Sequence, residues 1–151
     1  MIGRLAGIAR HDRPHGEIET VDTVSVTCAA GVAGDYRGGL KPGHNRRQIS
    51  LIEAESWQAA MAELGADIEW WQRRANLLVS GMRLPRLEGA KIRVGSSLVI
   101  EVTMECDPCS RMEAIRPGLK AALMPDWRGG VLGRVLKDGD IAVGDDIRIE
   151  E

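Results

Sequence analysis

The most distinctive chemical feature of the sequence is a pair of cysteines separated by two residues, Cys106-Asp107-Pro108-Cys109. The pair follows an apolar stretch typical of a strand, and Pro108 stiffens the turn before the second thiol. A thiolate is both a soft metal ligand and a good nucleophile. The segment therefore indicates a ligand site or a reactive thiol. Two ordinary buried cysteines are the alternative that the residues leave open.

Other cysteine chemistry fits the sequence less well. A structural zinc site needs about four protein ligands. Besides the pair, only Cys28 and the histidines at positions 11, 15 and 44 remain, and none repeats the spacing. A thioredoxin-like dithiol is expected beside a strand-helix-strand unit, whereas this pair follows a predicted hairpin. We expect Cys28 to be a small buried hydrophobe and the three histidines to lie exposed in loops.

Arginines next to turns and glycines form the second chemical feature. A guanidinium donates hydrogen bonds in a bidentate fork, and glycine-rich backbone exposes N–H donors, so this combination favours binding of a phosphate or another planar anion. For any one arginine, a solvated surface position is the alternative. The groups are Arg46-Arg47, Arg73-Arg74, Arg111 with Arg116, and Arg128 beside Gly129-Gly130.

Asn76 is a polar residue at the start of a predicted apolar strand. Its amide supplies both a donor and an acceptor, which suits hydrogen bonding to a heterocycle. The other role open to it is to satisfy a nearby turn.

Strands and one helix are predicted to position these residues. Four segments have the β-branched, alternating character of strands: Ile2 to Ala9, Ile18 to Thr27, Gln48 to Ile52, and Asn76 to Val79. A glycine-rich loop from Ala29 to Asn45 separates the second strand from the third.

The helix follows the third strand. Ser50 and Glu53 have the spacing of a capping box, and an apolar stripe formed by Trp57, Met61 and Leu64 ends at Gly65.

A sequence pattern that occurs twice, called here the internal repeat, indicates the fold class. Ile92 to Glu101 resembles Ile141 to Glu150, and each copy predicts a hairpin with a tight glycine turn. Pro117 to Leu123 predicts a short helix that Pro125 stops. We expect a mostly β chain whose sheet closes into a barrel, with one or two peripheral α-helices.

Composition limits the function classes. The 151 residues are 44% hydrophobic and 28% charged with a net charge of −2, which predicts one globular domain over residues 1–151 and no general affinity for nucleic acid. No run of about eighteen apolar residues is present, so we expect no membrane span. The N-terminal residues do not read as a secretory signal, and the odd count of three cysteines argues against a disulfide framework. We expect a cytoplasmic protein.

Five segments together carry a resemblance to a known family. In chain order they are Gly31-Val32-Ala33-Gly34-Asp35, Arg47-Gln48-Ile49-Ser50-Leu51-Ile52, Arg74-Ala75-Asn76-Leu77 with Ser80-Gly81, Cys106 to Cys109, and Gly139-Asp140-Ile141 with Gly144-Asp145. In these segments the chain resembles a MOSC domain, the module named for the C-terminal portion of molybdenum cofactor sulfurase, in its compact bacterial stand-alone form.

The resemblance implies a fold, a cofactor and site residues. The fold would be a MOSC-type β-barrel. Relatives that bind molybdenum cofactor include a bacterial reductase of N-hydroxylated bases and the mitochondrial amidoxime-reducing component. By this resemblance Cys109 would be the catalytic residue and the molybdenum ligand, while Arg74, Asn76 and Arg47 would hold the pterin (molybdopterin). The pyridoxal-phosphate domain of the sulfurase has no counterpart here, so that cofactor is not expected.

The resemblance implies two functions, and the residues leave a third open. The first is a molybdenum-dependent oxidoreductase that reduces N-hydroxylated small molecules with help from a redox partner. The second is a sulfur carrier in which Cys109 holds a persulfide and exchanges it with donor and acceptor proteins. The third is a non-catalytic β-barrel interaction domain with structural cysteines.

Overall fold

The protein is described here from a computed structural model, which covers residues 2–40 and 45–150. The strands are β1 (Ile2–Arg10), β2 (Glu19–Thr20), β3 (Thr23–Thr27), β4 (Gly31–Val32), β5 (Ile49–Glu53), β6 (Leu77–Ser80), β7 (Lys91–Val94), β8 (Leu98–Glu105), β9 (Val131–Lys137), β10 (Gly139–Ala142) and β11 (Asp146–Glu150). The helices are α1 (Ala54–Leu64), α2 (Ser110–Ile115) and α3 (Leu119–Leu123), with 3-10 turns η1 (Trp70–Arg73) and η2 (Pro125–Trp127).

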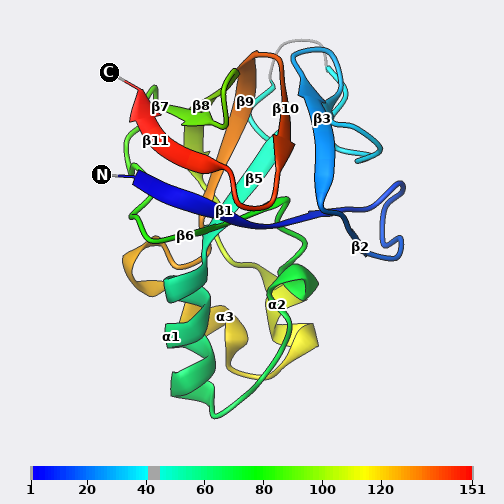
Figure 1. The fold of residues 1–151 in the computed structure, drawn as a ribbon. Helices are drawn as coiled ribbons and strands as arrows, with labels where there is room; N and C mark the ends of the chain where they lie inside the picture. Colours follow the sequence, from blue (N-terminus) through cyan, green and yellow to red (C-terminus); the bar gives the residue numbers. More distant parts are fainter. Residues whose placement is uncertain (1, 41–44, 151) are drawn as a thin grey trace.

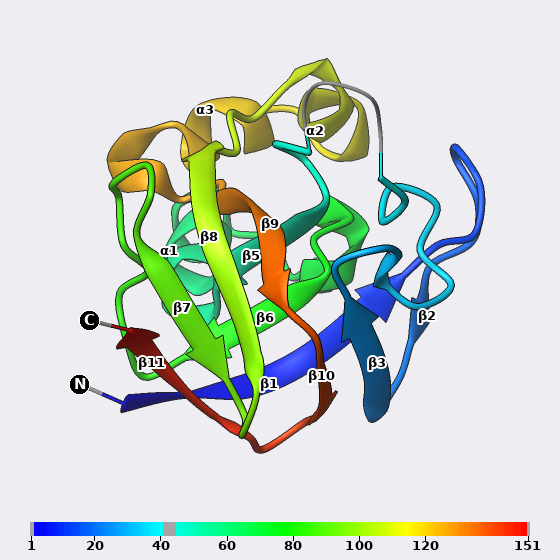
Figure 2. The ribbon, with the colours of Figure 1, turned by 90° about the horizontal axis from the view of Figure 1, so that it is seen from above.

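The main sheet closes into a barrel, as expected. Its strands follow the order β11-β7-β8-β9-β5-β6-β1, and β11 also pairs with β1, so the ring has no open edge among these seven strands. β2 extends the sheet beyond β1, and a separate sheet of β10, β3 and β4 lies against one side. Figure 2 looks into the ring formed by these strands.

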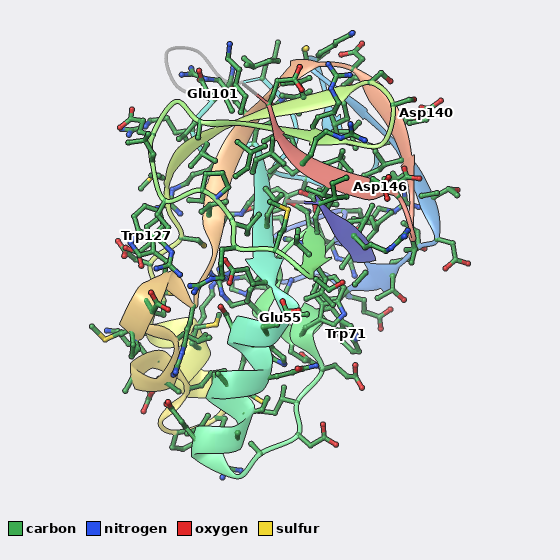
Figure 3. All side chains as sticks on the ribbon, turned by 60° about the vertical axis from the view of Figure 1, so that its left-hand side comes forward. Glu55, Trp71, Glu101, Trp127, Asp140 and Asp146 are labelled. Atoms are coloured by element: carbon green, nitrogen blue, oxygen red, sulfur yellow. The ribbon has the colours of Figure 1, made fainter. Side chains whose placement is uncertain are left out.

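Alternating side chains fill the barrel. In β1, for example, Gly3 and Leu5 are buried while Arg4 and Ala6 face solvent. Figure 3 shows Glu101 and Asp140 at the end of the barrel opposite the helices. The largest fully buried barrel side chains are Leu5, Ile8, Ile49, Leu51, Leu77, Ile92, Leu98, Ile100 and Ile147.

Helix α1 connects β5 to β6, which are the parallel pair in the ring. It ends at Gly65 in the left-handed conformation (φ 60°), as its sequence predicts. The capping-box expectation is wrong, because Ser50 lies inside β5 and Glu53 is itself the N-cap residue without a side-chain cap. The buried Glu53 carboxylate instead accepts hydrogen bonds from Ser56, Arg83 and the backbone of Leu84.

The helices pack at one end of the barrel (Figure 1), where they form a second apolar cluster. Helix α1 contacts α3, and α3 contacts α2. Trp57, Met112, Leu119 and Leu123 are buried there, so the short helices are stabilised mainly by tertiary packing.

Two strand predictions need correction. The segment from Ile18 to Thr27 is not one strand but two, because β2 pairs with β1 while β3 joins the second sheet. The first copy of the internal repeat, Ile92 to Glu101, is a hairpin of β7 and β8, as expected. The second copy is not a hairpin, since β10 pairs with β3 whereas β11 pairs with β7 and β1. It is a corner at which the chain passes from one sheet to the other.

The expected peripheral helices are present, since α1 and α3 lie where a long and a short helix are predicted. The described residues also form α2 and the 3-10 turn η1, which the sequence pattern does not predict. The helix predicted from Pro117 begins at Leu119, after Gly118 (φ 93°).

Candidate functional site

The two cysteines of the pair occupy different environments. Cys109 is exposed and is the N-cap residue of α2, in extended conformation. Cys106 is buried at the end of β8, where its backbone N–H donates to the carbonyl oxygen of Gly130 at 2.9 Å. All three cysteines are free, and Cys28 is only partly buried, less than expected. The pair thus consists of one accessible thiol and one thiol inside the structure.

Arg73 ties the buried cysteine to the neighbouring loop. Its Nη2 contacts Sγ of Cys106 and donates to the carbonyl oxygen of Gly129 at 2.9 Å. The side chain is 8% exposed, and its Nε has no hydrogen-bond partner among the described residues. This arginine positions the segment that carries both cysteines. The sequence analysis placed Arg73 with Arg74 in a possible anion site and did not predict its contact with Cys106.

Arg74 and Arg111 both reach the loop that follows β1. Arg74 adopts a left-handed conformation (φ 65°), and its Nη1 donates to the carbonyl oxygen of Gly16 at 3.0 Å. Nη2 of Arg111 lies 3.1 Å from Nε2 of His15. Because Arg111 is two residues after Cys109, these contacts connect the start of α2, residues 15–16 and the end of η1. Of the sequence-predicted site residues, Arg74 reaches this loop directly, whereas Cys109 is related to it only by its position two residues before Arg111.

Asn76 is held between two strands. Its Oδ1 accepts from the backbone N–H and the hydroxyl of Ser50, at 3.0 and 3.1 Å, and its Nδ2 donates to the carbonyl oxygen of Ala9 at 3.2 Å. The side chain is buried, so these bonds use both lone pairs of the amide oxygen and one amide hydrogen. No acceptor among the described residues takes the second amide hydrogen.

We expect Asn76→Ala to lower the free energy of unfolding by about 2 kcal/mol, because it removes three hydrogen bonds at a buried position. Urea denaturation of this variant, compared with Gln58→Ala on the exposed face of α1, measures the effect. A change no larger than that of the Gln58 variant would show that these bonds do not hold β1 and β5 together.

Arg47 stays apart from this network. It is exposed in the turn before β5, and no ion pair joins it to residues 2–40 or 45–150. Its neighbour Arg46 contacts Glu88 at 3.6 Å, and Arg128 pairs with Glu63 at 2.9 Å. The Arg116 guanidinium contacts the carbonyl oxygen of Leu64. The predicted arginine groups thus do not converge on one point.

His11 is buried, contrary to the expectation of an exposed loop histidine. Its backbone N–H donates to Oδ1 of Asp35 at 3.1 Å, and its Nδ1 lies 3.5 Å from the same oxygen. Tyr36 packs at a tilt against the ring. Sequence reasoning missed this pair because 24 residues separate its members. His15 is exposed as expected, and His44 lies outside the described residues.

Burial lowers the pKa of His11 below its usual 6.5, and the positive charges of Arg74, Arg37 and Arg111 act in the same direction, whereas Asp35 opposes them. The imidazole is therefore neutral near pH 7.

This lowered pKa predicts a pH dependence of stability. Between the lowered pKa and 6.5, the unfolded chain binds more protons at His11 than the folded one does. The contribution of neutral His11 to the free energy of unfolding is complete above pH 6.5 and is lost as the pH falls through the pKa of His11 in the folded protein. We expect a smaller free energy of unfolding at about pH 5.5 than at about pH 7.5, with a smaller difference in His11→Asn. Equal pH dependence in the two proteins would contradict this assignment.

Two acidic groups flank Cys106. Burial raises the pKa of Glu105, as do the charge and hydrogen bond of the Asp107 carboxyl. No cluster of three or more His, Cys, Asp or Glu side chains suited to a metal ion occurs in the part of the chain that is described. The helices described there include none that is long and apolar enough to cross a bilayer.

Comparisons with known proteins agree with this architecture. The model of the MOSC domain family matches residues 39–148. The structure is similar to that of YuaD from Bacillus subtilis, with a TM-score of 0.81, 24% identity, and coverage of 97% of this chain and 94% of that chain. None of the curated proteins matches this chain.

Two YiiM structures are also similar. YiiM from Geobacillus stearothermophilus gives a TM-score of 0.73 at 18% identity, covering 99% of this chain and 75% of that one. YiiM from Escherichia coli gives a TM-score of 0.67 at 15% identity, covering 98% of this chain and 70% of that one. At these identities the likeness shows the fold.

Proposed function

Because the chain belongs to the MOSC domain family, we propose that it binds a molybdenum cofactor at Cys109 and reduces N-hydroxylated small molecules there. The observation that carries the proposal is the exposed thiol of Cys109 at the start of α2, two residues before Arg111. An exposed soft donor, two residues along the chain from an arginine that has no carboxylate partner in the described structure, suits a metal bound to an anionic organic group.

The residues present fit such a group. Cys109 offers one soft ligand, which suits a metal whose other ligands come from the pterin. Arg74 and Arg111 face the same loop, and neither pairs with a carboxylate within residues 2–40 and 45–150, so both charges are available to the pterin phosphate. Asn76 can donate its remaining amide hydrogen to the heterocycle. Arg47 lies exposed in the turn before β5, apart from these residues, and its contact with the pterin stays a prediction.

In this proposal the protein residues bind the cofactor and orient it. Cys109 holds the metal through sulfur, and the arginines fix the anionic end of the cofactor. When bound, the molybdenum centre supplies the two-electron redox chemistry. Cleavage of the N–O bond takes up two electrons and two protons and releases water and the reduced base. The electrons come from a redox partner, such as a reduced flavoprotein or iron–sulfur protein.

Elemental analysis tests the proposal. Protein purified from a host that makes the cofactor is expected to contain molybdenum close to one atom per chain and to reduce an N-hydroxylated base with a chemical reductant. Protein from a host that cannot make the cofactor should show neither property. Absence of molybdenum in both preparations would contradict the proposal and favour a non-catalytic barrel.

Exposure of Cys109 also supports the second candidate, a sulfur carrier. A donor persulfide would pass its outer sulfur to the Cys109 thiolate, forming a new persulfide there and leaving the donor as thiolate. An open thiol at the start of a surface helix is accessible to donor and acceptor proteins, and a reducing compartment such as the cytoplasm keeps it free. A mass gain of one sulfur atom at Cys109 after incubation with a cysteine desulfurase and cysteine would support this function. No gain would exclude it.

A further inference from the structure

An open cavity of about 280 Å³ lies between helix α1 and residues 67–69, which belong to the segment that connects α1 to η1. Trp57 and Met61 of α1, together with Trp70 of η1, contribute large apolar side chains to its lining. The volume is close to the lower end of the range found for small-molecule sites, which is about 300 Å³. None of the residues that the proposed function assigns to the cofactor lines this hollow, which we call the α1 cavity.

Side chains of α1 hold the connecting segment in place. The Nε1–H group of Trp57 donates to the carbonyl oxygen of Ile68 at 2.8 Å, and the N–H group of Ile68 donates to Sδ of Met61 at 3.4 Å. The N–H group of Ala66 donates to the carbonyl oxygen of Met61 at 3.0 Å. Both backbone groups of Ile68 are therefore paired with side chains that themselves line the cavity. A ligand that enters a site held in this way does not have to order it first.

The barrel fixes the position of Trp70. The indole ring lies against β1 at Gly7, where an added Cβ atom would come within 2.7 Å of Cζ2 of Trp70. The pairing of β1 with β6 changes register between Leu5 and Gly7, next to this contact. The missing side chain at Gly7 thus leaves the space that the ring occupies. Tryptophan is the side chain whose π face attracts a cation most strongly.

Two acidic residues add negative charge to the α1 cavity. Asp67 and Glu69 both line it and are exposed, and no Lys, Arg or His of the described residues forms an ion pair with either. Elsewhere on the surface acids do find arginines, as in the pairs Glu63–Arg128 and Glu150–Arg93. The lining itself includes no basic residue. Two carboxylates next to apolar side chains therefore favour a ligand that is both apolar and positively charged.

The shape of the α1 cavity favours a small molecule over a protein partner. The large hydrophobic side chains that the described structure exposes all lie outside its lining. The apolar surface at this place is therefore concave, and a stable protein interface needs about 800 Å² of contact surface on each partner.

We propose that the α1 cavity is a binding site for a small aromatic ammonium ion, that is, a protonated amine joined to an aromatic ring. The ring packs against Trp57, Met61 and Trp70, and the ammonium group faces the carboxylates of Asp67 and Glu69. This binding site goes beyond the proposed function and does not depend on it.

Three probes of similar shape separate charge from apolar contact: phenethylammonium, the neutral 2-phenylethanol and the anionic 3-phenylpropanoate. Calorimetric titration is made at low ionic strength, where screening is weak, and at about pH 7, where the amine and both carboxylates are charged. Phenethylammonium should bind at least about fivefold tighter than 2-phenylethanol, the effect of one unit charge about 4 Å away in water. The anion should bind more weakly than the alcohol. Equal binding of the three probes, or no binding of phenethylammonium, would overturn the proposal.

Charge removal tests the two carboxylates. The double variant Asp67→Asn with Glu69→Gln should reduce the preference for phenethylammonium over 2-phenylethanol to less than about twofold. Both side chains are exposed, and Glu69 makes no cap bond to η1, so the fold should be unaffected. The matched control is Glu17→Gln, which removes an exposed carboxylate that lies outside the lining and should keep the preference. An equal loss in the control would indicate general surface charge and contradict the site.

Two adjacent tryptophans test the aromatic lining. Trp70→Leu should weaken phenethylammonium binding at least about threefold, because it removes the indole that a cation contacts. Trp71→Leu makes the same change in the same 3-10 turn, at a residue that does not line the α1 cavity, and should change binding less than about twofold. A larger effect at Trp71 than at Trp70 would place the ligand elsewhere and overturn the proposal.

A measurement on the wild-type chain covers the case in which the Trp70 variant does not fold. In nuclear magnetic resonance spectra, the indole N–H signals of Trp57 and Trp70 should shift as phenethylammonium is added, whereas that of Trp127, outside the lining, should not. Shifts confined to Trp127 would overturn the proposal. All of these titrations use the whole chain from a host that cannot make molybdenum cofactor, so their result is independent of the molybdenum content that tests the proposed function.

Discussion

Cys109→Ser is expected to lower molybdenum affinity on the order of 100-fold or more while leaving the fold intact. The serine oxygen is a hard donor that stays protonated at neutral pH, so the soft ligand is lost. Because Cys109 is exposed and makes no side-chain cap, its removal creates no cavity. Metal content after gel filtration, together with the urea midpoint, measures both parts of the prediction.

Cys106→Ser is the matched control. It makes the same chemical change three residues away, at a buried thiol that contacts Arg73. We expect it to lower stability more than molybdenum content. Equal loss of molybdenum in the two variants at unchanged stability would show that Cys109 is not the distinctive ligand.

Gly130→Ala is expected to lower the free energy of unfolding by at least about 4 kcal/mol. Gly130 has a φ of 91°, and a Cβ atom there would overlap the carbonyl oxygen of Leu51 in β5. β9 would have to move away from β5. Because the Gly130 carbonyl oxygen accepts from the N–H of Cys106, this movement would also displace the cysteine segment.

Gly89→Ala is the control that separates the steric overlap of the new Cβ atom from the strain of a left-handed backbone. Gly89 has nearly the same φ, 92°, but a Cβ atom there has nothing within 4 Å. We expect this variant to lose only about 1–2 kcal/mol, the cost of the left-handed conformation alone. Urea denaturation of both variants measures the difference. Similar losses would mean that the close approach of Gly130 to β5 is not what restricts this position.

Local patterns were sufficient to predict most of the barrel. Alternation in segments such as Ile2 to Ala9 places strands correctly, because each buries one face. The stripe that ends at Gly65 similarly predicts α1. The pattern failed where pairing decides the structure, as at residues 141–150, because no local signal shows that β10 and β11 join different sheets.

The candidate site was predictable only in part. The spacing of Cys106 and Cys109 identifies the pair in the sequence. The structure shows that Cys106 is buried and Cys109 is exposed, a difference that depends on the hydrogen bond between Cys106 and Gly130 at the end of β8. Arg73 and Arg74 are adjacent and chemically identical, and no local signal shows that Arg73 contacts Cys106 whereas Arg74 reaches Gly16. His11 and Asp35 lie in separate loops, and their pairing is a consequence of the tertiary fold.

X-ray absorption at the molybdenum edge tests the central claim most directly. Spectra of the loaded wild-type protein should show a thiolate sulfur beyond those that the pterin provides, and that sulfur should be missing in Cys109→Ser. Identical sulfur coordination in the two proteins would mean that Cys109 does not bind the metal, and would contradict this account.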